Sequence, residues 1–159
     1  EVLRTESTTP IFENDTALFF AGSVASLNAE IIYVFAAGVC IRAKYVIKEG
    51  HTNLNKYLLD YKKLRDLLVQ KYGEVAANEG YLDDMFWVNR LYVDDSDDWG
   101  FAVSLGHLIL DANWETDDTR IALILMGDNY DISLHLEYSS QELQDLEDRI
   151  LEERHLNEL

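Results

Sequence analysis

The sequence predicts an α+β fold built from two degenerate β-β-β-α units, in which an antiparallel sheet carries the helices packed on one face. Two observations lead to this prediction. Residues 39–47 alternate between apolar and polar side chains, and residues 54–72 then repeat apolar side chains at helical spacing. The same succession of patterns returns after residue 100. We therefore interpret residues 1–159 as a single domain whose pseudo-repeat halves, about 17–73 and 100–156, are joined by an acidic connector at 74–99.

The first half contains three expected strands followed by a helix. Leu18–Leu27 is the first strand candidate, and Ile31–Phe35 is a continuous run of β-branched and aromatic residues. A short link, Ala36-Ala37-Gly38, joins this run to the alternating strand at 39–48, so the two strands are expected to form a hairpin. The helical pattern that follows ends at Gly73, a residue suited to the left-handed conformation that closes a helix.

The second half repeats this order of elements. Phe101–Leu110 is its first strand candidate, and a Gly-Asp-Asn turn connects the apolar run Ile121–Met126 to the alternating segment Tyr130–Tyr138. These two segments are expected to form a second hairpin. Ser139 or Ser140 then caps the expected final helix, whose apolar face carries Leu143, Leu146 and Ile150.

The connector between the halves has no clear helical periodicity, although Met85–Val88 is a candidate for a further strand. Its tip, Asp94–Asp98, is expected to be an exposed loop. Because a hairpin and one helix are marginal alone, we expect the two units to share a core, with the helices against one face of the sheet. The opposite face, or a groove beside the connector, is then the natural recognition surface.

The composition is that of a folded, soluble protein. Apolar residues make up 48% of the chain and aromatic residues 11%, so hydrophobic burial can offset the entropy of ordering it. No apolar run approaches the roughly 18 residues that span a bilayer, and no membrane insertion is expected. Because the chain begins with Glu1, a leader could have preceded it; the cytoplasm is the expected location, with the periplasm as the alternative. Cys40, the single cysteine, leaves no intramolecular disulfide or Cys-based zinc site.

The charge is strongly negative and unevenly distributed. With 30 acidic and 13 basic side chains the formal net charge is −17, which disfavours nucleic acids and anionic membranes and favours a basic partner. Residues 42–71 nevertheless carry a charge of +5, whereas residues 74–98 carry −7 and residues 141–159 carry −5. Such a bipolar field can orient a docking protein or a second copy of the same chain.

The aspartates of the connector are the most conspicuous candidate site. Closely spaced carboxylates suit Ca²⁺ or Mg²⁺, but an EF-hand loop read from Asp94 places Trp99 where the turn glycine belongs and Leu105 where the bidentate glutamate belongs. No metal or cofactor is therefore expected. The cluster is interpreted as a solvated loop or as a patch that faces a partner. Its candidate partner-binding residues are Asp94, Asp95, Asp97 and Asp98.

Two tryptophans are candidate anchors for the same interface, because aromatic side chains near acidic residues are frequent hot spots. Trp99 ends the acidic loop, and Trp114 lies in a polar, turn-like setting that predicts partial exposure. Trp87, by contrast, lies in an expected strand and is assigned to the core.

No catalytic signature is found in the sequence, and an enzyme is not expected. The four histidines show no zinc spacing, and the chain has no Gly-rich phosphate loop and no nucleophile elbow. A site assembled from carboxylates that are distant in sequence stays open as an alternative, because paired acids need only proximity in space.

Three segments carry a resemblance to known families. Ile31–Phe35, Ala43–Val46 and Leu67–Gly73 resemble uncharacterised bacterial α+β proteins in which paired strands precede a helix ending in Lys-Tyr-Gly. The layout is also similar to the helix-plus-sheet repeats of β-lactamase-inhibitor-like and outer-membrane-assembly lipoproteins, and to small acidic secretion chaperones. The resemblance implies that the chain acts by binding other proteins.

These observations favour a non-enzymatic acidic protein-binding module with a basic partner. Its narrower forms are a chaperone, an immunity-like protein that neutralises a toxin, an inhibitor in an enzyme cleft, or a mimic of nucleic acid. The alternatives are a small-ligand binder or hydrolytic enzyme with a carboxylate-based site, and a structural homo-oligomer. In such an oligomer, for example a homodimer, the basic stretch of one copy meets the acidic stretches of another.

Overall fold

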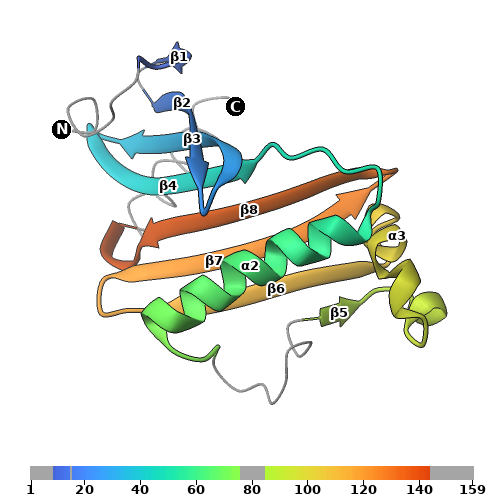
Figure 1. Ribbon diagram of the computed structural model, residues 1–159. Helices are drawn as coiled ribbons and strands as arrows, with labels where there is room; N and C mark the ends of the chain where they lie inside the picture. Colours follow the sequence, from blue (N-terminus) through green and yellow to red (C-terminus); the bar gives the residue numbers. More distant parts are fainter. Residues whose placement is uncertain (1–8, 15, 76–84, 144–159) are drawn as a thin grey trace, which may run out of the picture.

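The fold combines one large antiparallel sheet with a few helices, as the expected α+β class requires (Figure 1). The computed structural model describes residues 9–14, 16–75 and 85–143 of the chain. Within them, eight strands form a single sheet in the order β1-β2-β3-β4-β8-β7-β6-β5. The strands are β1 (Phe12–Glu13), β2 (Ala17–Val24), β3 (Leu27–Ala36), β4 (Val39–Ile47), β5 (Met85–Trp87), β6 (Leu108–Glu115), β7 (Thr119–Asp128) and β8 (Asp131–Ser140); the helices are α2 (Asn55–Tyr72) and α3 (Trp99–Ser104).

Two three-stranded meanders make up most of the sheet. The strands β2, β3 and β4 form the first, and β6, β7 and β8 form the second; they join where β4 pairs with β8, from Arg42 opposite Ser139 to Val46 opposite His135. Both expected hairpins are confirmed, and Ala37 and Gly38 turn the first of them with positive φ angles of 50° and 77°. The expected final helix begins at residues 141–143, which are helical, and its remainder, with Leu146 and Ile150, lies outside the described residues.

Two of the expected strands are wrong in their extent. The first ends at Val24, because Ala25 and Ser26 adopt positive φ and reverse the chain, so that Leu27 already belongs to β3. The segment Phe101–Leu110 was expected to be a strand, but its first residues form α3 and only Leu108 onward is extended. Ala102 and Val103 are fully buried in α3, so its apolar run reflects a helix enclosed by the core.

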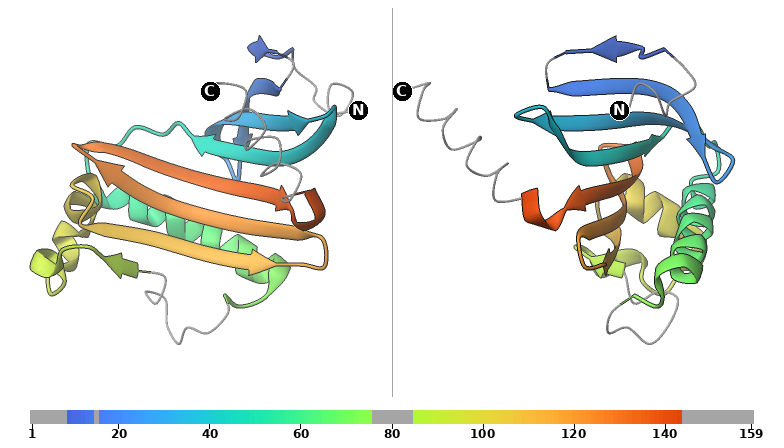
Figure 2. Two further views of the ribbon diagram at one scale, coloured as in Figure 1. Left: turned by 180° about the vertical axis from the view of Figure 1, so that it is seen from behind. Right: turned by 90° about the vertical axis from the view of Figure 1, so that its left-hand side faces the viewer.

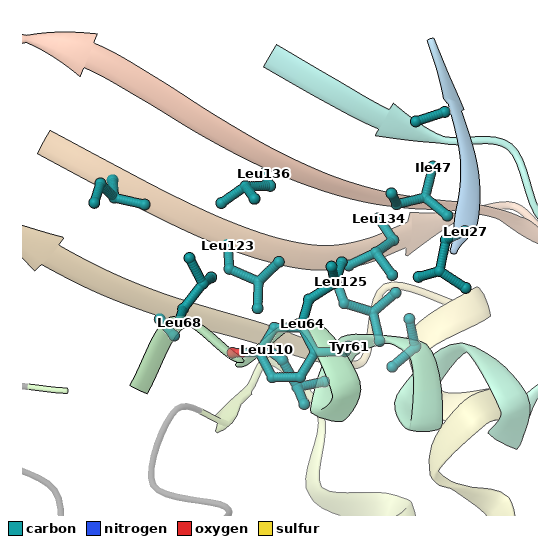
Figure 3. Packing of buried hydrophobic residues seen from close by; sticks show 14 of the residues in the cluster. Leu27, Ile47, Tyr61, Leu64, Leu68, Leu110, Leu123, Leu125, Leu134 and Leu136 are labelled. Atoms are coloured by element: carbon teal, nitrogen blue, oxygen red, sulfur yellow. The ribbon is translucent and has the colours of Figure 1, made fainter. Parts of the chain in front are cut away.

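The core lies between α2 and one face of the sheet. Helix α2 lies across β6 and β7 (Figures 1 and 2) and presents Tyr61, Leu64 and Leu68 at helical spacing, with exposures of 1%, 2% and 5%. These side chains meet the alternate, inward residues of the strands, among them Leu123 and Leu125 (Figure 3). Burying each such side chain contributes roughly 1.5–3 kcal/mol, so this contact fixes α2 on the sheet.

Neither α2 nor α3 covers the other face of the sheet (Figure 2). Its cross-strand rows mix apolar and charged side chains, such as Ile32, Lys44, Glu137 and Ala122 in one row.

Among the described segments, no helix combines the length and apolar character needed to cross a bilayer.

Candidate functional site: a groove beside an acidic turn

A groove of about 300 Å³ opens between α2 and the segment that leads into α3. Helix α2 forms one wall, the turn that precedes α3 forms the other, and β6 supplies the floor. The exposed fraction of Leu59 is 62%, which is high for a leucine beside an apolar cavity. The lining residues are Asn55, Leu58, Leu59 and Lys62 from α2, Ser96 and Trp99 from the opposite wall, and Leu110 from β6.

Asn55, the first residue of α2, holds the two walls together. Its amide Nδ2 donates to the carbonyl oxygen of Asp97 at 2.7 Å and more weakly to that of Ser96 at 3.4 Å. Its Oδ1 accepts from the backbone N–H of Gly100 at 2.6 Å. Only glycine fits there, because a Cβ on Gly100 would lie 2.3 Å from the carbonyl carbon of Leu54.

Trp99 forms the apolar part of the second wall. Its indole N–H donates to the carbonyl oxygen of Tyr92 at 3.1 Å, and its ring meets the ring of Trp87 edge to face at 6.2 Å. The side chain is therefore held by the core on one side and borders the groove on the other. Of the two candidate tryptophan anchors, Trp99 lies where an incoming side chain can reach it.

The expected exposed loop, Asp94–Asp98, contains one single-turn 3₁₀ helix, Ser96–Asp98, and follows another, Arg90–Tyr92. The four aspartates of this acidic turn, Asp94, Asp95, Asp97 and Asp98, are all exposed. Asp95 caps the second 3₁₀ helix through its Oδ1, which accepts from the backbone N–H of Asp97 at 3.1 Å. Among the described residues, none of the four carboxylates takes part in an ion pair.

The expected partial exposure of Trp114 is wrong. Trp114 lies in β6, is 4% exposed, and donates its indole N–H to the carbonyl oxygen of Gly73 at 2.9 Å. Its neighbours Asp111, Asn113 and Glu115 point to solvent from the same strand, which gave the segment its polar, turn-like appearance. Trp114 therefore fastens the end of α2 to the sheet and is not accessible to a partner.

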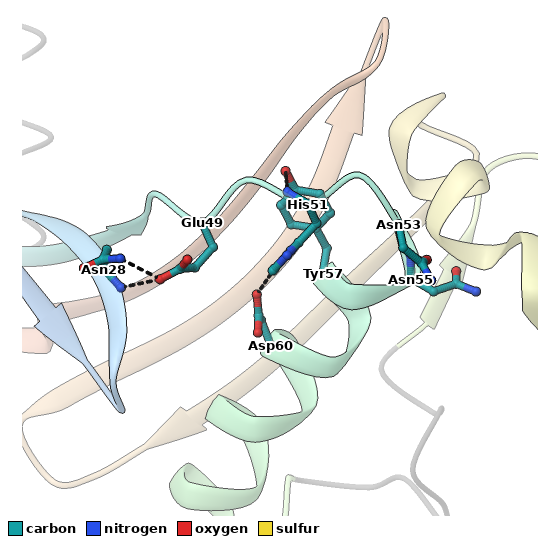
Figure 4. A network of polar contacts seen from close by, with 7 residues as sticks. All are labelled: Asn28, Glu49, His51, Asn53, Asn55, Tyr57 and Asp60. Carbon is teal, nitrogen blue, oxygen red and sulfur yellow. Dashed lines mark hydrogen bonds and ion pairs between the residues drawn. The ribbon is translucent and has the colours of Figure 1, made fainter.

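A polar network anchors the segment between β4 and α2 (Figure 4). The ring Nε2 of His51 lies 2.5 Å from Asp60 Oδ2, and the ring of His51 meets that of Tyr57 edge to face. Upstream, Glu49 accepts two hydrogen bonds from Asn28. The described contacts of His51 include no serine or cysteine, so the arrangement lacks the nucleophile of a hydrolytic triad and serves to hold the crossover.

The uncovered face of the sheet holds a smaller cavity of about 130 Å³, bordered by Arg42, Arg120 and Glu137. Glu137 lies 3.4 Å from the Nε of Arg42 and 3.9 Å from the Nζ of Lys44. Within the described residues no three His, Cys, Asp or Glu side chains are grouped so that they could hold a metal ion.

Two half-buried residues of β8, His135 on the uncovered face and Tyr138 on the face that packs against α2, have displaced pKa values. Burial, assisted by the charge of Lys44, lowers the pKa of His135 to about 4, and its Nδ1 is buried without a hydrogen-bond partner. His135 is therefore neutral at pH 7, and the fold resists its protonation. Burial and the neighbouring Tyr72 raise the pKa of Tyr138 well above its usual range, so its hydroxyl stays protonated.

Comparison of the chain with protein-family models, curated proteins and solved structures finds no match.

Sequence reasoning placed the acidic turn and Trp99 but missed the α2 wall. A signal for Leu59 was present, because it falls outside the buried stripe of α2 that contains Tyr61, Leu64 and Leu68. Helical spacing therefore predicts that Leu59 is exposed, whereas its place beside a cavity follows only from the structure. The role of Asn55 could not be predicted from the sequence, because its hydrogen-bond partners Asp97 and Gly100 are more than 40 positions away along the chain.

Proposed function

We propose that the chain is a non-enzymatic, acidic protein-binding module that receives a basic partner at the acidic groove, defined as the groove together with the acidic turn. One observation carries the proposal: an apolar cavity with a tryptophan in its wall adjoins four exposed carboxylates that make no ion pair in the described structure. An apolar centre beside a charged rim is the usual anatomy of a protein interface.

The two parts of the site have different physical roles. An apolar side chain of the partner enters between Leu59 and Trp99, and the removal of these surfaces from water supplies most of the affinity. The aspartates attract the basic partner over a distance and set its orientation, so they act on the association rate more than on the final affinity. The partner is accordingly a protein with an exposed apolar residue beside lysines or arginines, and nucleic acid is excluded by repulsion.

We also propose that the fold consists of two related β-β-β-α units. The meanders β2-β3-β4 and β6-β7-β8 meet at the centre of the sheet in mirrored order, which supports two degenerate β-β-β-α units. Chaperone-, immunity- and inhibitor-like modes all use this kind of surface, and the nature of the partner decides among them.

The experiment is a capture of partners by the purified chain from a lysate of its own organism, at about 50 mM and about 150 mM salt, with identification by mass spectrometry. The captured protein is then purified and its dissociation constant is measured by calorimetry. We expect Leu59→Asp to weaken binding by more than about tenfold, because it places a charge in the apolar centre. Leu67→Asp, on the exposed side of the same helix but away from the groove, is the matched control and should change binding less than about twofold.

The charge contribution needs its own control. Replacing Asp94, Asp95, Asp97 and Asp98 by Asn should slow association and reduce its salt dependence. The control carries the same change of charge at exposed acids far from the acidic turn: Glu13→Gln, Glu74→Gln, Asp117→Asn and Glu142→Gln. Binding that is insensitive to both the Leu59 and the aspartate substitutions would place the partner elsewhere and refute this site.

A further inference from the structure

We infer that the acidic groove is self-complementary, and that two copies of this chain associate through it as a two-fold symmetric dimer. The inference goes beyond the proposed partner and does not require it, because it concerns the chain alone. The two walls of the groove differ in the sign of their charge. A uniformly basic partner complements the acidic turn but not the wall formed by α2, whereas an occupant that is itself bipolar complements both.

The α2 wall is basic immediately around its exposed leucine. The neighbours of Leu59 on the helix surface at i−3, i+3 and i+4 are Lys56, Lys62 and Lys63. Lys62 also borders the groove, where it forms an exposed ion pair with Asp66 at 3.9 Å. Lys62 thus lies on one side of the groove, and the acidic turn, which contributes Ser96 to the lining, lies on the other.

A two-fold contact brings these walls together in the required way. In a symmetric dimer the same patch is used by both copies, so residue i must complement residue j of the other copy and the reverse. With the two-fold axis along the groove, the α2 wall of one copy lies over the acidic turn of the other. Leu59 and Trp99 of both copies then form a shared apolar centre. Each copy supplies the basic half of one charged contact and the acidic half of the other.

The net charge of −17 opposes association, but it acts over a longer distance than the local pairs. At physiological ionic strength the Debye length is about 8 Å, so the repulsion between most charges of the two copies is screened. Lysine–aspartate contacts at the groove lie well inside that distance. Dimerisation is therefore expected at about 150 mM salt and is opposed at very low salt, where the net repulsion is unscreened.

The dimer and the proposed basic partner use one surface and exclude each other. A partner must therefore displace the second copy, and the apolar groove is covered while no partner is bound. This lowers the apparent affinity for weak partners and protects the exposed Leu59 from non-specific contacts.

The test reverses the charge of each wall separately. One variant carries Lys56→Glu, Lys62→Glu and Lys63→Glu; the other carries Asp94→Lys, Asp97→Lys and Asp98→Lys, and keeps Asp95 because it caps the turn. Each variant is examined alone and in an equimolar mixture by sedimentation velocity, next to the unmodified chain, with circular dichroism as the check on folding. All substituted side chains are exposed or half-exposed on the surface.

We expect the unmodified chain to dimerise, each variant alone to be monomeric, and the mixture to form a heterodimer, because only then does every wall meet its opposite charge. Leu59→Asp should weaken self-association at least about tenfold, and Leu67→Asp should leave it unchanged. A monomeric unmodified chain, a dimer that persists in both reversed variants, or a mixture that stays monomeric would each overturn the inference. None of these results depends on a captured partner, so failure of the dimer is distinguishable from failure of the proposed function.

Discussion

Asn55→Ala is the substitution that most directly tests how the groove is held together. Asn55 accepts from the buried N–H of Gly100 at 2.6 Å and donates to the carbonyl oxygen of Asp97 at 2.7 Å. A buried N–H left without a partner costs about 1–3 kcal/mol, and the exposed bond to Asp97 contributes about 1 kcal/mol. We therefore expect the free energy of unfolding to fall by about 2–4 kcal/mol, which is a large part of the 5–15 kcal/mol of a typical domain.

Urea denaturation measures this loss directly. With a slope of about 2 kcal/mol per molar urea, the unfolding midpoint should fall by about 1–2 M. Asn113→Ala is the matched control, because Asn113 also donates from its side-chain amide at 2.9 Å, but on an exposed strand surface; its effect should stay within about 0.5 kcal/mol. In nuclear magnetic resonance spectra the indole N–H signal of Trp99 should shift. A loss below about 0.5 kcal/mol for Asn55→Ala would refute the reasoning that this side chain joins the walls.

Three further substitutions test the surrounding structure. Gly100→Ala should destabilise by about 1–3 kcal/mol because its Cβ would lie 2.3 Å from backbone, whereas Gly50→Ala, which meets nothing within 4 Å, should not; thermal unfolding of the pair compares them. Trp114→Phe should cost about 1–3 kcal/mol in urea denaturation because the carbonyl oxygen of Gly73 loses its donor, and an unchanged midpoint would contradict this role. His135 has a pKa of about 4 in the folded state against 6.5 normally, so the unfolded chain binds more protons between these values and stability falls as the pH falls from 6.5 to 4. The ring is half-exposed, so solvent screening reduces the effect. Between pH 6.5 and 4 the free energy of unfolding should fall by about 1–2 kcal/mol more in the unmodified chain than in His135→Gln, and parallel pH profiles of the two proteins would disprove this expectation.

The parts of the fold that the sequence predicted are those with an unambiguous period. The segment 39–47 alternates and becomes β4, and the segment 54–72 repeats at helical spacing and becomes α2. Residues 99–104 have no period because α3 is enclosed by the core, and an apolar run of this length does not distinguish a helix from a strand. Trp114 was misplaced although its strand does alternate, because its polar neighbours were interpreted as a turn.

The candidate site shows the same division between local and long-range information. The exposure of Asp94–Asp98 follows from composition alone, since so many carboxylates cannot be buried without partners. The groove depends on contacts of Asn55 with residues more than 40 positions away, and nothing in one sequence pairs Asn55 with Gly100. The sequence could therefore indicate where the negative charge lies, but not that an apolar groove lies beside it.

The contacts that hold the acidic turn in place leave its carboxylates charged. Neighbouring carboxylates repel one another, and a turn kept in place by ion pairs would have its charge neutralised. Here the turn is fixed instead by neutral groups: the amide of Asn55 binds its backbone, and the indole of Trp99 binds the carbonyl oxygen of Tyr92. Its side-chain charges are thus left for contacts outside the chain. This repulsion is maintained in the free protein and would be relieved by the lysines or arginines of the proposed partner, so we expect binding to stabilise the turn.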